Sequence, residues 1–290
     1  MDSKNIEGTP ENYSQLYCSD KENAKIWFFG APLDKTTTYL KGTAQGPKAI
    51  RDAMIQTEEY DIRTDSNILD VGLFDLGDIK LTDGNEVETI RKKTEDVLKN
   101  GKTPLMFGGE HSVTLGVIQA IKNSKLNFKV VSFDAHADLR DTFEFDKNNH
   151  ACVMRRISDE IGKENILEIG IRSIAEEEKT FSDRMIFRYQ LRDNFDAAKK
   201  KLLEFVKNSN VCITVDMDVF DPGIAPGVGT PEPDGLLYHE VLELIKVLKN
   251  AKKIVGMDIV ELRPLPDNNV TEMTASKLLM ETIAQLKDKI

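Results

Sequence analysis

The strongest constraint on the fold of this 290-residue chain is an alternation of apolar segments with amphipathic segments along its whole length. Several apolar segments are continuous runs, which is typical of parallel strands covered on both faces. The predicted strands are Lys25–Pro32, Ile68–Phe74, Thr103–Gly109, Phe128–His136, Asn165–Ser173, Met185–Tyr189, Asn210–Phe220 and Lys252–Glu261. The predicted helices are Gly46–Tyr60, Glu86–Asn100, Val113–Lys122, Phe195–Lys207, Tyr238–Lys249 and Thr271–Lys287, the last with Thr271 as its N-cap.

This strand–helix alternation predicts an α/β fold with one doubly wound, mainly parallel sheet and helices on both faces. We find no internal repeat and no Pro- or Gly-rich linker, so we expect a single domain over residues 1–290. Forty per cent of the residues are hydrophobic, which is enough for a large core.

Charge and cysteine content limit the class of protein. The formal net charge is −10, which argues against nucleic acid or an anionic membrane as partner. Cys18, Cys152 and Cys212 are too few and too scattered for a disulfide framework or a structural zinc site. The N-terminal segment is polar and no apolar run reaches 18 residues, so we expect a cytoplasmic protein without a membrane partner.

Polar residues gather at the ends of four predicted strands, where open α/β sheets bind their ligands. The four groups are Gly108–Ser112 ("GGEHS"), the triplet Asp134, His136 and Asp138, the pair Asp216 and Asp218, and Glu261. Three of the four histidines, His111, His136 and His150, lie in or just after these groups. We expect the fourth, His239, on the surface of a helix.

Spacing of two on a strand places Asp134, His136 and Asp138 on one face. A lone strand-end Asp commonly caps the next helix, and a lone His is commonly a hydrogen-bonded core residue. Four converging carboxylates, however, require a compensating cation. Oxygen-rich ligands with two imidazoles favour a pair of divalent first-row ions, manganese first, with zinc, cobalt or nickel as substitutes in vitro. The predicted ligands are His111, Asp134, His136, Asp138, Asp216 and Asp218, and the predicted chemistry is metal-assisted hydrolysis.

These segments, in this order, resemble the ureohydrolase family of arginase and agmatinase. The matching segments are Gly30–Arg51, "GGEHS", "SFDAHADLRD", "GIRS", "TVDMDVFDPGIAPGVGTPEPDGL" and "GMDIVEL". The resemblance implies a three-layer arginase-type fold, two Mn²⁺ ions per chain and a homo-oligomer, trimeric or hexameric. It also implies that His111, Asp134, Asp138 and Asp216 hold one ion and that Asp134, His136, Asp216 and Asp218 hold the other, so that Asp134 and Asp216 bridge them.

The resemblance further implies how the site acts. A hydroxide that bridges the metals would attack a guanidinium carbon, and the intermediate would collapse to urea and an amine. Asp138 would orient the hydroxide and take up its proton, Glu261 would pair with the guanidinium and Thr230 would hydrogen-bond it. His150 would bind near the substrate and relay protons. The alternatives are a surface ion pair for Glu261 and a solvent-exposed loop position for His150.

Agmatine is the predicted substrate, cleaved to putrescine and urea in polyamine biosynthesis. The segment "FDKNNHACV" lacks the Ser-Gly pair that precedes the loop histidine in arginases, and the chain is closer to agmatinase-like members. Asn149 and Asp234 depart from the agmatinase pattern, and we expect both to flank the far end of the substrate. The alternatives are guanidinobutyrate, guanidinopropionate, arginine or formimidoyl-glutamate as substrate, a zinc deacetylase with one ion, or a non-catalytic binding protein.

Overall fold

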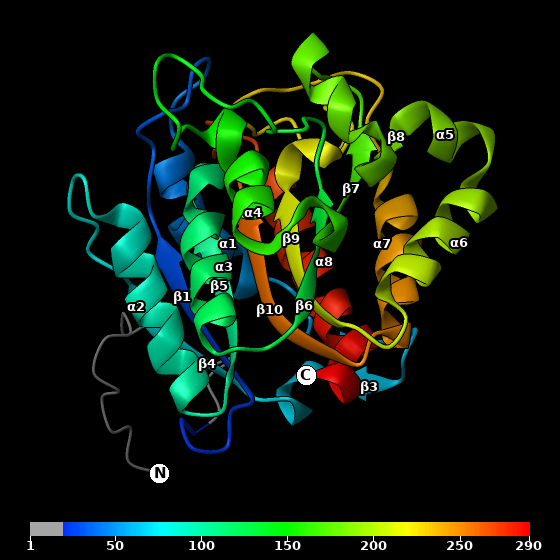
Figure 1. Ribbon diagram of the computed structural model, residues 1–290. Coiled ribbons are helices and arrows are strands. Elements are labelled where there is room, and N and C mark those ends of the chain that lie inside the picture. The colour runs from blue at the N-terminus through cyan, green and yellow to red at the C-terminus, as the bar shows by residue number, and fades with distance from the viewer. Residues whose placement is uncertain (1–19) are drawn as a thin grey trace.

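The computed structural model describes residues 20–290, so Cys18 and the polar N-terminal segment lie outside the described residues. Eight strands form one sheet in the order β4-β1-β5-β10-β9-β6-β7-β8, and all their pairings are parallel (Figure 1). Their bounds are β1 (Ile26–Ala31), β4 (Leu73–Asp78), β5 (Thr103–Gly108), β6 (Phe128–Phe133), β7 (Ile166–Ile171), β8 (Met185–Phe187), β9 (Asn210–Asp216) and β10 (Lys253–Val260). A short antiparallel pair, β2 (Tyr60–Asp61) and β3 (Ser66–Asn67), lies outside this sheet.

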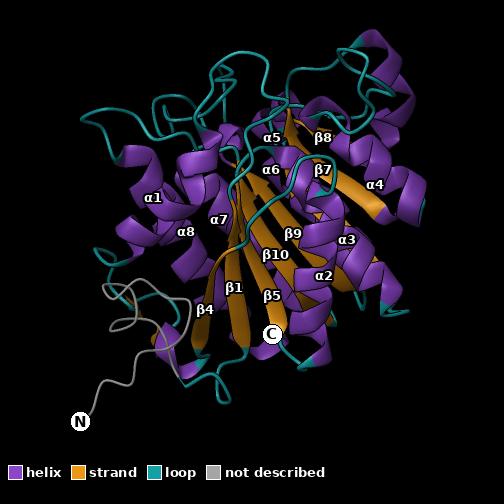
Figure 2. Cartoon of the chain, turned by 90° about the vertical axis from the view of Figure 1, so that its left-hand side faces the viewer, coloured by secondary structure: helices purple, strands orange, loops and turns teal. Residues whose placement is uncertain are grey.

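Helices cover both faces of the sheet and give three layers (Figure 2). One face carries α1 (Gly46–Met54), α6 (Phe195–Val206), α7 (Tyr238–Val247) and α8 (Val270–Leu286), and the other carries α2 (Glu86–Lys99), α3 (Thr114–Asn123) and α4 (Val153–Ile161). Along β6, Val131 and Phe133 enter the first core while Val130 enters the second. Burial on both faces explains the continuous apolar strands, and the predicted fold class is confirmed. Among residues 20–290, no helix has the length and apolar character needed to cross a membrane.

The predicted strand Ile68–Phe74 is wrong in its bounds. Ile68–Asp70 forms a 3-10 turn, and Asn67 accepts a hydrogen bond from the Leu69 N–H at 2.9 Å. Gly72 then has φ 74°, a left-handed conformation that the glycine permits, and β4 begins at the next residue. Ile68 is buried in the turn as fully as it would be in a strand, so apolar character alone did not separate the two.

Other boundaries also differ from the predictions. Helix α1 ends at Met54 rather than Tyr60, Tyr189 lies in the short helix α5 (Arg188–Asp193), and α4 was not predicted. Thr271 is not an N-cap, because α8 begins at Val270. Its Oγ1 instead accepts a hydrogen bond from the Gly227 N–H at 2.7 Å. The hydroxyl therefore satisfies a loop amide that is distant in sequence.

Strands β5, β10, β9 and β6 are consecutive in the sheet, and their carboxyl ends bring the polar segments together. His111 follows β5, Glu261 follows β10, Asp216 ends β9 and Asp134 follows β6. The parallel topology thus places four distant segments at one edge of the sheet.

A buried ion pair joins α1 to β4. Arg51 is 5% exposed, and its Nε and Nη2 bond the two carboxylate oxygens of Asp75 at 2.8 and 3.0 Å. Asp78 also pairs with this guanidinium. This bidentate geometry compensates the charge of an arginine that has almost no access to water.

We predict that Asp75→Asn lowers the free energy of unfolding by about 3 kcal/mol, because it leaves a buried guanidinium incompletely paired. Urea denaturation followed by circular dichroism measures this change. Asp52→Asn is the control, since its pair with Lys48 is an exposed i,i+4 contact, worth less than about 1 kcal/mol. Equal losses in the two variants would contradict a special role for the buried pair.

Candidate metal centre

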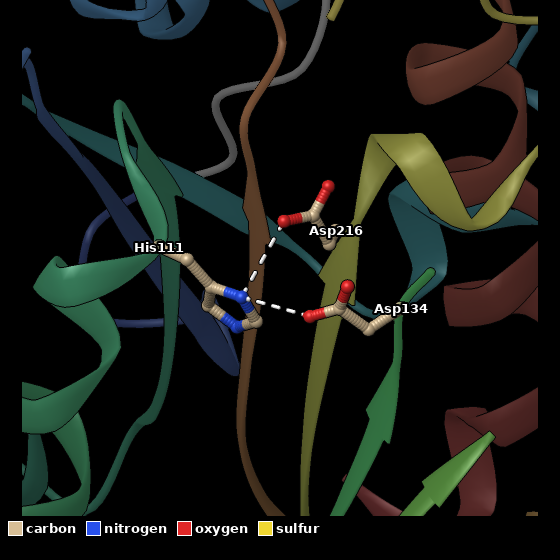
Figure 3. Close-up of side chains that lie close together, drawn as sticks. All are labelled: His111, Asp134 and Asp216. Carbon is tan, nitrogen blue, oxygen red and sulfur yellow. Dashed lines mark ion pairs between the residues drawn. The ribbon is translucent and has the colours of Figure 1, made fainter. Parts of the chain in front are cut away.

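Carboxylates lie close to one imidazole at the carboxyl edge of the sheet, and Figure 3 shows two of them, Asp134 and Asp216, directed toward His111. His111 Nδ1 lies 3.1 Å from Asp134 Oδ2, 3.3 Å from Asp138 Oδ2 and 3.4 Å from Asp216 Oδ2. All four side chains are buried. The structure therefore brings together residues from the segments after β5, after β6 and at the end of β9.

A second group shares Asp134 with the first. His136 Nδ1 lies 2.9 Å from Asp218 Oδ2 and 3.9 Å from Asp134 Oδ1. Asp134 thus faces both imidazoles, as a residue that bridges two ions would. Asp216 groups with His111 and Asp134. Its contact with a second ion stays a prediction.

The ligand-rich segment after β6 is not a continuing strand, so the prediction that one strand face carries its three polar residues is wrong. Strand β6 ends at Phe133, and Asp134 Oδ1 accepts a hydrogen bond from the His136 N–H at 2.7 Å. Asp138 has a left-handed backbone, φ 51°, and its carboxylate turns toward His111. A turned loop, rather than pleating, makes these side chains converge.

The segment after β9 also turns, and a side-chain-to-backbone hydrogen bond holds the turn. Asp216 is the last strand residue, and its Oδ1 accepts a hydrogen bond from the Asp218 N–H at 2.8 Å. Asp218 lies in the following 3-10 turn, and its Oδ1 accepts the Ala135 N–H at 3.1 Å. This last bond ties the two ligand-bearing loops to each other.

The two imidazoles fit a metal centre in their orientation. His111 presents Nδ1 to the carboxylates, while its Nε2 lies 3.0 Å from Thr214 Oγ1. His136 likewise presents Nδ1, while its Nε2 lies 3.8 Å from Glu232 Oε2. The Thr214 contact holds His111 as metal-ligating histidines are held, through the second nitrogen, whereas the distance from His136 to Glu232 exceeds that of a hydrogen bond. His111 Nδ1 and Asp134 Oδ2 are also buried without a hydrogen bond, as ligand atoms of a divalent ion would be.

The protonation of the cluster reflects its burial and crowding. Burial and the carboxylates of Asp218 and Asp138 raise the pKa of Asp134 to about 7. Burial lowers the pKa of the His136 imidazole, but Asp218 and other carboxylates outweigh it and raise that pKa to about 11. Burial also lowers the pKa of the His111 imidazole, but the surrounding carboxylates outweigh burial and raise that pKa well above its ordinary value. Without a divalent cation, protons compensate the negative charge.

Glu261 and His150 lie beside the cluster. Glu261 Oε1 accepts a hydrogen bond from the His111 N–H at 2.7 Å and lies 3.5 Å from His150 Nδ1, whereas Oε2 has no hydrogen bond. Glu261 and His150 are 2% and 8% exposed, so the alternatives of a surface ion pair and a solvent-exposed loop histidine are wrong. Burial lowers the pKa of the His150 imidazole, but the neighbouring Glu261 carboxylate outweighs burial and raises that pKa to about 9.

A cavity of about 220 Å³ opens onto these groups. Its lining includes Asp138, His150, Asp216, Asp218, Thr230, Glu261, Arg140 and Phe143. Thr230 Oγ1 donates a hydrogen bond to Asp218 Oδ2 at 3.2 Å. The predicted catalytic and substrate-binding residues therefore share one cavity with several predicted metal ligands.

Asn149 and Asp234 are not among the residues that line this cavity, and their place beside the far end of the substrate stays a prediction. Asn149 is buried, and its Oδ1 accepts a hydrogen bond from the Ala151 N–H at 3.0 Å. Asp234 is exposed and lies 3.4 Å from Arg192 Nη1. Asn149 therefore caps the turn that begins at His150, whereas Asp234 makes a surface ion pair. The exposed position predicted for His239 is confirmed.

Sequence reasoning missed a buried carboxylate that supports the His150 loop. Glu110, within "GGEHS", accepts hydrogen bonds from the Thr36 N–H at 2.6 Å and the Thr36 hydroxyl at 2.8 Å. The same hydroxyl oxygen accepts the His150 N–H at 2.9 Å. In the sequence, Glu110 directly precedes the predicted ligand His111, and this position only weakly indicates a role for Glu110 in the site. Its partners Lys35 and Thr36 are more than 70 residues away, so only the fold could reveal them.

Known proteins are similar to this chain in sequence and in fold. The family described as the Arginase family matches residues 24–284. The N(1)-aminopropylagmatine ureohydrolase of Thermococcus kodakarensis is 39% identical over 273 residues, which cover 92% of each chain. The agmatinase of Bacillus anthracis is 34% identical over 267 residues, 90% of this chain and 92% of that protein. The crystal structure of the agmatine ureohydrolase of Thermoplasma volcanium is 38% identical, with a TM-score of 0.85 and 94% of each chain covered.

We predict that metal binding at this cluster releases protons and strengthens as pH rises from 6.5 to 8.5. The metal-free cluster holds protons at neutral pH, with pKa values of about 7 for Asp134 and about 11 for His136, and a divalent ion must displace them. Calorimetric titration of chelator-treated protein with Mn²⁺, in buffers of different ionisation enthalpy, measures both effects. Asp134→Asn should weaken binding. Affinity that is independent of pH, or that falls as pH rises, would exclude this site.

Proposed function

Because the chain belongs to the arginase family and is an agmatinase-like ureohydrolase, a hydrolase of carbon–nitrogen bonds in guanidino compounds, we propose that its substrate is agmatine. The products would be putrescine and urea. One observation carries the proposal: a single cavity joins the acid-imidazole cluster to a buried carboxylate, Glu261, that has an oxygen free of hydrogen bonds. A planar guanidinium cation is a suitable partner for such a carboxylate.

Each residue of the cavity has a separate role in the proposed reaction. Two divalent ions, which we propose to be Mn²⁺ held by His111, Asp134, His136, Asp138, Asp216 and Asp218, would when bound lower the pKa of water and supply hydroxide. Glu261 pairs with the guanidinium and fixes the carbon that is attacked. Asp138 orients the nucleophile and accepts its proton. Thr230 hydrogen-bonds the guanidinium, and His150 donates a proton to the departing amine.

Agmatine has a cationic group at each end, which suits an acidic chain of net charge −10. The similarity to a protein named agmatinase and to one named agmatine ureohydrolase supports this substrate. A second candidate is N(1)-aminopropylagmatine, which the name of the Thermococcus kodakarensis relative specifies. It carries the same guanidino group on a longer polyamine.

We also propose a homo-oligomer in the cytoplasm, with no nucleic acid or membrane partner. The oligomer is supported by the family resemblance. The location is supported by the scarcity of cysteine and the lack of long apolar segments in the sequence.

Urea release from a panel of substrates tests the proposal. We expect Mn²⁺-loaded protein to have its highest kcat/KM with agmatine, compared with N(1)-aminopropylagmatine, arginine, guanidinobutyrate and guanidinopropionate. The same panel without added metal, after chelation, is the control and should be inactive. A preference for a guanidino acid would overturn the proposed substrate. Absence of urea from every compound would overturn the proposed reaction.

We predict that His150→Ala lowers kcat about 100-fold or more, the range for loss of a proton-transfer group, and leaves the bound metal unchanged. Steady-state urea release and elemental analysis measure these two quantities. His239→Ala is the matched control, because that histidine is exposed and is not among the residues that line the cavity. Loss of metal in His150→Ala would instead identify it as a ligand.

A further inference from the structure

Arg172, the arginine of the "GIRS" segment, places its guanidinium among backbone carbonyl groups beneath the metal centre. Its shortest bonds are from Nη2 to Asp218 O at 2.6 Å, from Nη2 to Glu232 O at 2.8 Å and from Nε to Pro233 O at 3.0 Å. Longer bonds reach Val219 O, Phe220 O and Gly170 O, at 3.2, 3.3 and 3.4 Å. One side chain thus fixes two separate loops, residues 218–220 and 232–233.

The backbone of the same segment holds the other ligand-bearing loop. The Arg172 and Ser173 N–H groups both donate to Ala135 O, at 2.9 and 3.1 Å. The Ala135 N–H in turn donates to Asp218 Oδ1 at 3.1 Å. Arg172 is therefore bonded through its main chain to the loop of His136 and through its side chain to the loop of Asp218.

These contacts support the ligand group of His136 and Asp218 more directly than the ligand group of His111. The guanidinium bonds the carbonyl of Asp218 itself, and Glu232, whose carbonyl it also bonds, places a carboxylate 3.8 Å from His136 Nε2. His111, by contrast, is held by Thr214 and Glu261, which come from β9 and from the end of β10. The support of the His111 imidazole is thus independent of the arginine side chain, although Asp216 bonds the Asp218 N–H of the loop that the arginine holds.

We propose that Arg172 is a positioning residue for the metal ion held by His136 and Asp218, and that it sets the affinity of that ion without setting the affinity of the ion held by His111. The proposal rests on the two-ion centre of the proposed function. Its physical basis is the planar guanidinium, whose five N–H donors match carbonyl groups from several directions. A lysine ammonium retains the charge, but it offers three donors on a flexible stem and cannot hold both loops in register.

Manganese titration of Arg172→Lys, as the full-length chain, tests the proposal. Metal content by elemental analysis gives the number of ions, and electron paramagnetic resonance separates a spin-coupled Mn²⁺ pair from a single Mn²⁺. We expect wild type to bind two ions, and Arg172→Lys to bind the first normally and the second about 10- to 100-fold more weakly, as is usual when a group supporting a ligand is changed. The variant spectrum at low metal should be that of a single ion.

A matched control and a second background separate positioning from general stability. Arg188→Lys changes a buried arginine that bonds Asp234 O and Glu240, and it should keep both ions at wild-type affinity. In a His136→Ala background, which removes a ligand of the weaker ion, Arg172→Lys should leave the affinity of the remaining ion unchanged.

Three outcomes would overturn the proposal: two-ion binding at wild-type affinity in Arg172→Lys, equal weakening of both ions, or loss of the remaining ion in the His136→Ala background. Arg172→Gln, which keeps two amide donors, should reproduce the selective loss. If neither variant folds, the arginine has a global structural role and the proposal fails. A wild-type chain that binds fewer than two ions would instead refute the two-ion centre, whatever Arg172 does.

Discussion

Mutual repulsion of buried carboxylates is the constraint on which this structure depends. Asp134, Asp138, Asp216 and Asp218 lie at one edge of the sheet with almost no access to water. Burial and mutual repulsion raise the pKa of Asp216 well above its ordinary value, whereas His136 outweighs burial and keeps the pKa of Asp218 low. A protein retains such a cluster when a cation compensates it. The two imidazoles are oriented so that divalent ions would do so.

The surrounding backbone supports this charge with directed N–H groups. Asp134, Asp216, Asp218 and Glu261 each accept an amide hydrogen bond from a residue in or beside the ligand loops. Arg172 extends the support by bonding the carbonyl groups of those loops. The geometry of the centre therefore depends on turned loops at the strand ends, while the strands set where each loop begins.

The cavity places the buried carboxylate cluster beside the residues proposed to bind the substrate. The carboxylates proposed to hold metal and the carboxylate proposed to bind a cation are different residues, and the His111 N–H joins the two sets by donating to Glu261. The proposed sites of substrate binding and of nucleophile formation are therefore tied to the same loop. The hydrogen bonds from Glu110 through Thr36 to His150 hold the backbone of His150 in a comparable way.

The sequence by itself determined the α/β class, the parallel sheet and the identity of the polar groups at its edge, because apolar runs and D-x-D spacings are local properties. It did not determine the path that brings those groups together. The strand-face prediction for Asp138 was wrong since a left-handed turn, φ 51°, directs its carboxylate. The sequence also left Glu110 and Thr214 without a role, and it gave no physical role to Arg172. Most of their hydrogen-bond partners lie tens of residues away, and only the order of strands in the sheet makes them neighbours.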